Sequence, residues 1–95
     1  MKTYLIVDIA VHDRERFAEY VKLVPPFIEK HNGSYLVRGG SHSTKEGTWQ
    51  PDRLVVLEFP SKHDAEAFLA DPDYAPVAAI RHEAADSNLV MVDGV

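Results

Sequence analysis

The sequence contains no cysteine among its 95 residues. Disulfide bonds, thiolate catalysis and zinc sites built on cysteine are therefore excluded. No apolar run approaches the ~20 residues that a membrane-spanning helix requires. Asp8 interrupts the apolar start of the chain, and no cleavage site of small residues follows it. We therefore expect a soluble, cytoplasmic protein that does not associate with membranes.

Basic residues are also scarce. Ten Lys and Arg stand against fifteen Asp and Glu, and the formal net charge is −5. Proteins that bind nucleic acids gain much of their affinity by neutralising phosphates with a basic surface, and here the basic residues are scattered. The five histidines fall at no metal-ligand spacing such as i,i+2 or i,i+4. The sequence thus predicts no nucleic-acid partner and no metal site.

What is present is the composition of an ordinary globular protein, with 45% hydrophobic and 26% charged residues. A chain of this length builds one hydrophobic core and not two. We therefore expect residues 1–95 to form a single domain.

The first half of the chain predicts a strand followed by a helix. Residues 4–11 are apolar and β-branched, as in a buried strand. Asp13 is a candidate N-cap for a helix that begins at Arg14 and repeats apolar residues at spacings of three and four. Pro25–Pro26 kinks or restarts that helix. Asn32–Gly33 ends it, with glycine expected to take a left-handed conformation.

Two further strands and a long connection follow. Residues 35–38 begin the second strand, and the double glycine at 39–40 indicates a bulge or a close backbone approach. Residues 41–52 are polar and turn-forming and join two strands as a long hairpin loop. Residues 53–59 form a third strand.

The remaining residues predict two helical segments and a last strand. Ser61 and Asp64 resemble a capping box that opens a helix. Asp71–Pro72 opens a second, short helix with proline at its first position. Residues 89–92 form the fourth strand. The resulting order β-α-β-β-α-β predicts an α+β, ferredoxin-like sandwich, with a four-stranded antiparallel sheet and the helices on one face.

The first and third strands carry apolar residues on both of their faces. Helices can cover only one of these faces, and the other would be a larger apolar patch than soluble monomers usually expose. The sequence therefore predicts a homodimer in which two copies meet through the free face of the sheet.

Three segments resemble a known family. They are Y-L-V-R-G-G at 35–40, E-G-T-W-Q-P-D-R-L-V-V-L-E-F-P-S at 46–61 and D-P-D-Y-A-P-V-A-A-I-R at 71–81. Together they resemble the family called domain of unknown function 1330, over essentially the whole chain. The resemblance implies the dimeric α/β-barrel form of the ferredoxin-like fold. That wider superfamily includes cofactor-independent monooxygenases, muconolactone isomerase-like enzymes and haem-degrading proteins, so the resemblance implies no single reaction.

Arg38 and Glu58 are single charges in otherwise apolar strands. A charge buried in such a strand must be paired or must face a wet cavity, since isolated burial costs several kcal/mol. Strands two and three are neighbours in the predicted fold, so the two side chains could form a salt bridge that fixes the hairpin. Alternatively, Arg38 anchors the carboxylate of a ligand beside Glu58 as a carboxylate base. A bulge at the double glycine would place them on opposite faces, so the register stays open.

Asp8 and Tyr20 are the other candidate catalytic residues. Asp8 either pairs with Arg38 or Arg81 or adds a third polar group to the same cavity. Tyr20 lies in the apolar stripe of the first helix, where it packs in the core or directs its hydroxyl into a cavity.

The second half of the chain supplies candidate ligand-binding residues. Phe68, Tyr74 and Arg81 could line the opposite wall of a pocket between helices and sheet, with Arg38 on the sheet side. Trp49, in the long loop, is either a lid or, as aromatic residues concentrate at interfaces, a dimer contact.

These residues predict a small enzyme, without a bound cofactor, that acts on a compact and partly apolar carboxylate or phenol. Arg38 would orient the acid, Glu58 or Asp8 would move a proton, and Tyr20 would donate a hydrogen bond. Oxygenation and isomerisation both fit, because each starts with removal of a proton next to an electron-withdrawing group. The alternative is a non-catalytic, ligand-binding or stress-associated dimer in which Arg38 binds an anion and no proton moves.

Overall fold

The computed structural model describes residues 1–95. Four strands and four helices follow one another along the chain: β1 (Thr3–Val11), α1 (Arg14–Leu23), α2 (Pro25–Lys30), β2 (Ser34–Arg38), β3 (Arg53–Phe59), α3 (Lys62–Ala70), α4 (Ala75–Ala84) and β4 (Ala85–Asp93). None of these helices combines the length and the apolar character needed to cross a membrane.

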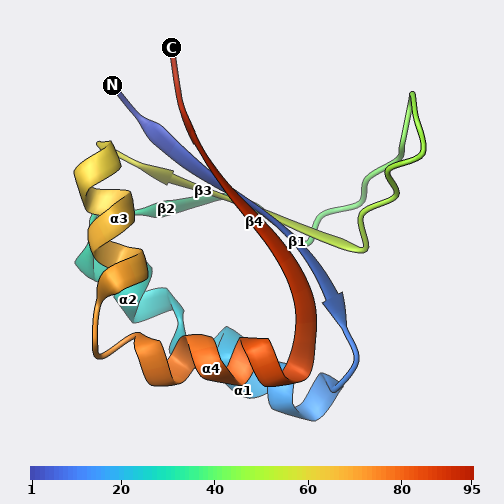
Figure 1. Ribbon diagram of the computed structural model, residues 1–95, viewed down its shortest axis with the longest axis horizontal. Helices are drawn as coiled ribbons and strands as arrows, with labels where there is room; N and C mark the ends of the chain where they lie inside the picture. Colours follow the sequence, from blue (N-terminus) through green and yellow to red (C-terminus); the bar gives the residue numbers. More distant parts are fainter.

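The four strands form one antiparallel sheet in the order β2-β3-β1-β4. The helices pack on one side of this sheet, and α1 and α4 lie side by side beneath one end of it (Figure 1). This arrangement confirms the predicted α+β, ferredoxin-like fold. β4 is longer than predicted, because pairing with β1 extends from Asp93 opposite Thr3 back to Ala85 opposite Val11, immediately after α4.

Alternate residues of the strands face the helices and form the core. On β1 these are Leu5, Val7 and Ile9, none of which is more than 5% exposed. Phe59 on β3 stacks on Phe68 of α3, with ring centroids 5.6 Å apart. Burial alternates along most of β1 and β3, as expected for strands with one face against the helices.

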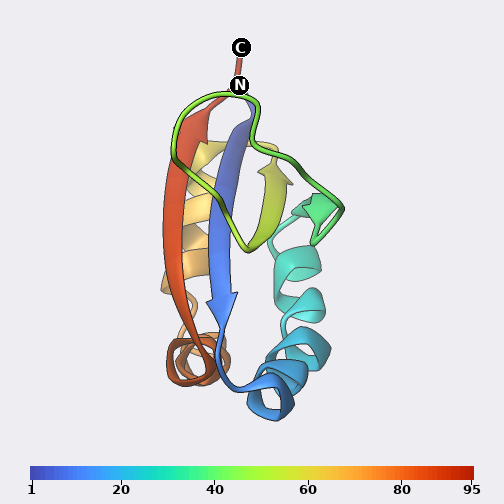
Figure 2. The same ribbon diagram turned by 90° about the vertical axis from the view of Figure 1, so that its right-hand side faces the viewer.

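The other face of the sheet, called here the outer face, carries no helix (Figures 1 and 2). At its centre Ile6 lies between Val56 of β3 and Val90 of β4 in the strand register. Val90 is 57% exposed and Val92 is 44% exposed. The chain by itself therefore leaves an apolar sheet face in contact with water.

The first helical segment is divided as the sequence predicts. The Asp13 side chain accepts a hydrogen bond from the backbone N–H of Arg16, α1 ends at Leu23, and α2 restarts at Pro25. The left-handed residue after α2 is Asn32, with φ of 65°, and not the glycine that follows it. Gly33 is needed for a different reason, since a Cβ atom there would lie 2.6 Å from the ring of Phe59.

The second helical segment differs from the prediction at its start. The Ser61 side chain accepts a hydrogen bond from the Asp64 N–H, as expected for the cap of α3. α4, however, begins at Ala75 and not at Pro72. Residues 72–74 form a turn instead, in which the Asp71 carboxylate accepts the N–H of Asp73 at 2.8 Å.

Asp71 also links this turn to α2. Its carboxylate accepts hydrogen bonds from Lys30 Nζ and from His31 Nε2, both at 2.8 Å. The hydrogen bonds from Lys30, His31 and the Asp73 backbone hold the pKa of the Asp71 carboxyl well below its usual range. Asp71 thereby ties together the two helical halves that cover the sheet.

The loop of residues 39–52 projects away from the body on the side opposite the helices (Figure 1). Hydrogen bonds hold it at its base: Trp49 Nε1 donates to the Asp8 carboxylate at 3.0 Å, and His42 Nε2 donates to the Pro51 carbonyl at 2.6 Å. The loop is therefore an arm that stands beside the uncovered outer face.

Candidate functional site

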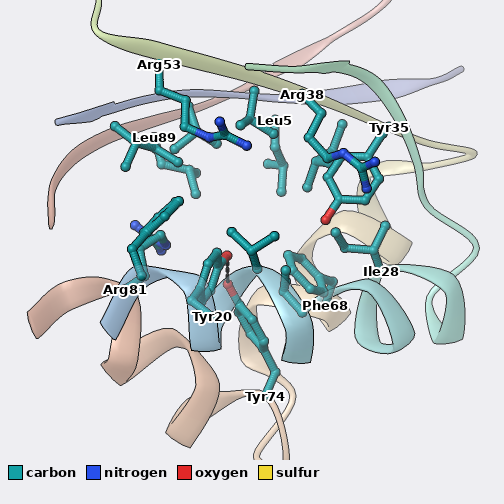
Figure 3. A pocket seen from close by; sticks show the side chains of 17 residues that line it. Leu5, Tyr20, Ile28, Tyr35, Arg38, Arg53, Phe68, Tyr74, Arg81 and Leu89 are labelled. Carbon is teal, nitrogen blue, oxygen red and sulfur yellow. Dashed lines mark hydrogen bonds between the residues drawn. The ribbon is translucent and has the colours of Figure 1, made fainter. Parts of the chain in front are cut away.

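A cavity lies between the inner face of the sheet and the helices (Figure 3). Its cavity volume is about 40 Å³. Seventeen residues line it, and fourteen of them are hydrophobic. A mostly apolar lining with a few convergent polar groups is typical of sites for small organic ligands.

The three remaining lining residues are arginines, which come from different elements. Arg38 at the end of β2 and Arg53 at the start of β3 extend into the cavity from the sheet. Arg81 extends into it from α4 (Figure 3). Each guanidinium lies over an aromatic ring: Arg38 over Tyr35 at 4.9 Å, Arg53 over Phe17 at 5.7 Å and Arg81 over Tyr20 at 5.7 Å from the ring centroid. Cation–π contacts of this kind hold a guanidinium in place without neutralising it.

None of the three arginines has a carboxylate partner. Every ion pair of the chain joins other residues, and no Asp or Glu lines the cavity. Arg81 is only 6% exposed, and its Nη2 lies 3.5 Å from His82 Nε2. Arg53 Nε is buried without any hydrogen-bond partner. The cavity thus collects positive charge that no protein group compensates, which is costly unless an anion supplies the missing partner.

Two tyrosines form the polar floor of the cavity. The hydroxyls of Tyr20 and Tyr74 are 2.9 Å apart (Figure 3). One hydroxyl donates to the other, so the second keeps its own proton free for a ligand. Burial, followed by the neighbouring Tyr74 hydroxyl, raises the pKa of Tyr20 above its ordinary value, although Arg81 acts in the opposite direction. Tyr20 therefore stays protonated, and the pair provides one O–H donor.

The structure brings together five of the predicted site residues. Arg38, Tyr20, Phe68, Tyr74 and Arg81 all line the cavity. Phe68 packs against Tyr74 with ring centroids 4.4 Å apart, so it supports the tyrosine pair as well as the wall.

Glu58 lies on the outer face, so the structure does not place it beside Arg38. A register shift between Tyr35 and Val37 turns Arg38 to the helix side, opposite Val55, whereas Glu58 stays on the other face. Arg38 and Glu58 therefore do not pair, because a bulge within β2, rather than one at the double glycine, places them on opposite faces. Glu58 pairs instead with Lys2, whose Nζ is 3.1 Å from its carboxylate.

Asp8 and Trp49 lie outside the cavity as well. Asp8 pairs with neither Arg38 nor Arg81, since its carboxylate accepts from Trp49 Nε1 and from the backbone N–H of Asp52 at 3.2 Å. Trp49 is 61% exposed and stands in the arm on the outer side. Neither carboxylate predicted as a base therefore reaches the three arginines within one chain.

Sequence reasoning missed two residues of the cavity, Arg53 and Tyr35. Arg53 has the same parity as the inward-facing Val55 and Leu57, so the period of two along β3 could have identified it. Tyr35 faces inward opposite Leu57, ahead of the bulge. The structure contains no cluster of three or more His, Asp or Glu side chains that could hold a metal ion.

Gly39 offers a test of how Arg53 is positioned. Its φ is +72°, and a Cβ atom there would lie 2.3 Å from Arg53 Nη1. We expect Gly39→Ala to lower the free energy of unfolding by about 1–2 kcal/mol, the cost of a left-handed residue with a side chain. It should also displace the Arg53 guanidinium. Gly40→Ala is the control, since nothing lies within 4 Å of a Cβ at that position. Equal denaturant midpoints for the two variants would contradict this prediction.

Comparison with known proteins places the chain among others of this architecture. Residues 2–95 match the family described as domain of unknown function (DUF1330). A search of curated proteins found no significant match.

Three solved structures illustrate the likeness of fold. A protein of unknown function from Rhodopseudomonas palustris, RPA0582, superposes with a TM-score of 0.80 at 19% identity, over 99% of this chain and 82% of that chain. A dimeric ferredoxin-like protein of unknown function from Jannaschia sp. CCS1 gives 0.73 at 11% identity, over 99% and 100%. SnoaB, a cofactor-independent oxygenase from Streptomyces nogalater, gives 0.69 at 13% identity, over 99% and 93%. At these identities the likeness establishes the fold alone.

Proposed function

Because the chain belongs to the DUF1330 family, whose members share no assigned reaction, we propose its function from the cavity itself. We propose that the cavity binds a small, partly apolar carboxylate or phenol as its anion and that the protein transforms this ligand without a bound cofactor. The observation that carries the proposal is the convergence of Arg38, Arg53 and Arg81 on an apolar cavity that contains no carboxylate. The cofactor-independent oxygenase SnoaB shares the fold, which is consistent with such chemistry.

The polar groups of the cavity suit an anionic ligand. A guanidinium donates two parallel hydrogen bonds to a carboxylate, and it also stabilises a phenolate oxygen. The free hydroxyl of the Tyr20–Tyr74 pair adds a third donor. Together these groups lower the pKa of a bound phenol, because they stabilise its charged form. The substrate can then bind as the anion, having left its proton to water.

Binding of the substrate as its anion, without a protein base in the cavity, favours oxygenation over isomerisation. An isomerase returns the proton to another carbon and needs a base that holds it, whereas Glu58 and Asp8 lie on the far face of the sheet. In oxygenation the electron-rich phenolate reduces O2 directly. One oxygen atom becomes a new ring carbonyl, and the other leaves as water with the two hydrogens of the phenol O–H and the ring C–H. Four electrons pass from the ring to O2, so the reaction balances without another reductant.

We further propose that the working form is a homodimer that pairs the outer faces of two copies. Ile6, Val56, Val90 and Val92 form an apolar surface that the helices do not cover. The dimeric ferredoxin-like protein from Jannaschia shares the fold and supports this assembly by analogy.

Arg38→Met tests the binding part of the proposal. Removal of one charge-assisted, bidentate contact should weaken the binding of 1-naphthoate by about 10- to 100-fold, measured by titration calorimetry. Arg38 is exposed at the cavity rim, so the melting temperature and the oligomeric state should not change. Arg14→Met, which removes an exposed arginine outside the cavity, is the control and should bind as the unmodified protein does.

Two results would decide against this reading. Unchanged affinity in Arg38→Met would remove Arg38 from the site, and unfolding of that variant would make its role structural.

Turnover is tested by O2 uptake with hydroxynaphthalenes, in which one O2 should be consumed per quinone formed. Binding of acids without any O2 uptake would favour the alternative, a non-catalytic ligand-binding dimer.

A further inference from the structure

The number of arginines in the cavity exceeds what one carboxylate or phenolate needs. Three guanidinium groups line it. A ligand with one negative charge on Arg38, which is exposed at the rim, would leave the buried Arg81 and the partly buried Arg53 uncompensated. Burial of an uncompensated charge costs several kcal/mol.

The arginines also reach the cavity from separate places. Arg38 and Arg53 hang from two neighbouring strands, and Arg81 approaches from the helix side near Tyr20 (Figure 3). Arg53 and Arg81 lie over the neighbouring rings of Phe17 and Tyr20, whose centroids are 5.7 Å apart, whereas Arg38 lies over Tyr35. A rigid ligand with acidic groups at two positions could contact both sets at once.

The walls between the arginines suit a flat ring. Leu5, Val7 and Leu57 form an aliphatic surface on the sheet side, and Tyr20 and Phe68 face it from the helices. A planar aromatic ring packs well between an aliphatic wall and other rings. A flexible aliphatic diacid would lose more conformational freedom on binding and would leave this apolar surface less well covered.

From these observations we infer that the natural ligand is an aromatic dianion, with one acidic group on Arg38 at the rim and a second on Arg81 and Arg53 inside the cavity. The buried Arg53 Nε and the 94% burial of Arg81, neither with a protein counter-ion, are what this second acidic group would satisfy. The inference rests on the proposed function, since it specifies the substrate class of the same cavity.

Calorimetric titration of the unmodified protein with four acids tests it: benzoate, isophthalate, terephthalate and succinate. We expect isophthalate or terephthalate to bind at least about tenfold more tightly than benzoate, because one further charge-assisted contact contributes about that factor. Succinate, a dianion without a ring, should bind more weakly than the better aromatic diacid. The affinity for the aromatic diacid should also fall more steeply with added salt than that for benzoate.

Arg81→Met should bring the affinity for the aromatic diacid down to that for benzoate. If Arg81→Met does not fold, Arg53→Met is measured instead. The comparison of the four acids on the unmodified protein tests the dianion inference without any variant. Equal affinities for benzoate and both aromatic diacids would overturn the dianion inference and leave the proposed function standing. If neither these carboxylates nor a hydroxynaphthalene binds at millimolar concentration, the proposed function fails together with it.

Discussion

We expect Val90→Lys to convert the dimer into folded monomers. Val90 lies at the centre of the outer face, next to Ile6 in the strand register, and is 57% exposed in the single chain. The variant chain should fold, because a lysine at an exposed strand position costs little. In a twofold-symmetric interface the substitution occurs twice, so two charges would be buried in an apolar contact. We expect association to weaken about a hundredfold or more, since a hot-spot residue contributes about 2 kcal/mol or more and the substitution occurs in both copies.

Sedimentation at micromolar concentration measures this effect directly. The unmodified chain, with a mass of 10.6 kDa, should sediment as a dimer, and Val90→Lys should sediment as a monomer. Leu69→Lys is the matched control, because Leu69 is a 39% exposed apolar residue of α3, on the helix side of the sheet. A dimer that persists in Val90→Lys, or an unmodified chain that is already monomeric, would show that the outer face does not join two copies.

A loss of about 3–5 kcal/mol in the free energy of unfolding is expected for Phe68→Ala. Phe68 is only 2% exposed, stacks on both Phe59 and Tyr74, and closes one wall of the cavity. Removal of the Phe68 ring would leave an empty space that enlarges the adjoining cavity. For a domain of this size the melting temperature should fall by at least about 12 °C.

Phe27→Ala is the control for Phe68→Ala. Phe27 loses the same atoms but is only half-buried, and its ring lies farther from Tyr74, at 5.9 Å. Its melting temperature should fall clearly less, and Phe68→Leu should fall between the two. A Phe68→Ala protein that melts within a few degrees of the unmodified chain would contradict the packing described here. Because single domains have only about 5–15 kcal/mol of stability, calorimetry should start at low temperature.

Most of the fold could be predicted because its signals are local. The alternation along β1 and β3, the caps at Asp13 and Ser61 and the restart at Pro25 depend on residues within one turn or one strand. Such signals act before any tertiary contact forms. The predicted start of α4 was wrong by three residues, because residues 72–74 form a turn in which the Asp71 carboxylate accepts the Asp73 N–H, and the helix begins only at Ala75.

The candidate site was only partly predictable because it depends on which way each strand residue faces. One bulge between Tyr35 and Val37 turns Arg38 toward the helices and separates it from Glu58. A shift of one residue reverses the face of every side chain beyond it, and nothing in the local sequence marked its position.

By itself, then, the sequence determined the order of the elements, the ferredoxin-like sheet and its apolar outer face, since these follow from local periodicity and caps. Only the tertiary structure decided that Arg38, Arg53 and Arg81 converge without a carboxylate, while Asp8 and Glu58 stay on the other side. The physical reason is that convergence of distant residues depends on strand register and on helix placement over the sheet, which are set by long-range packing.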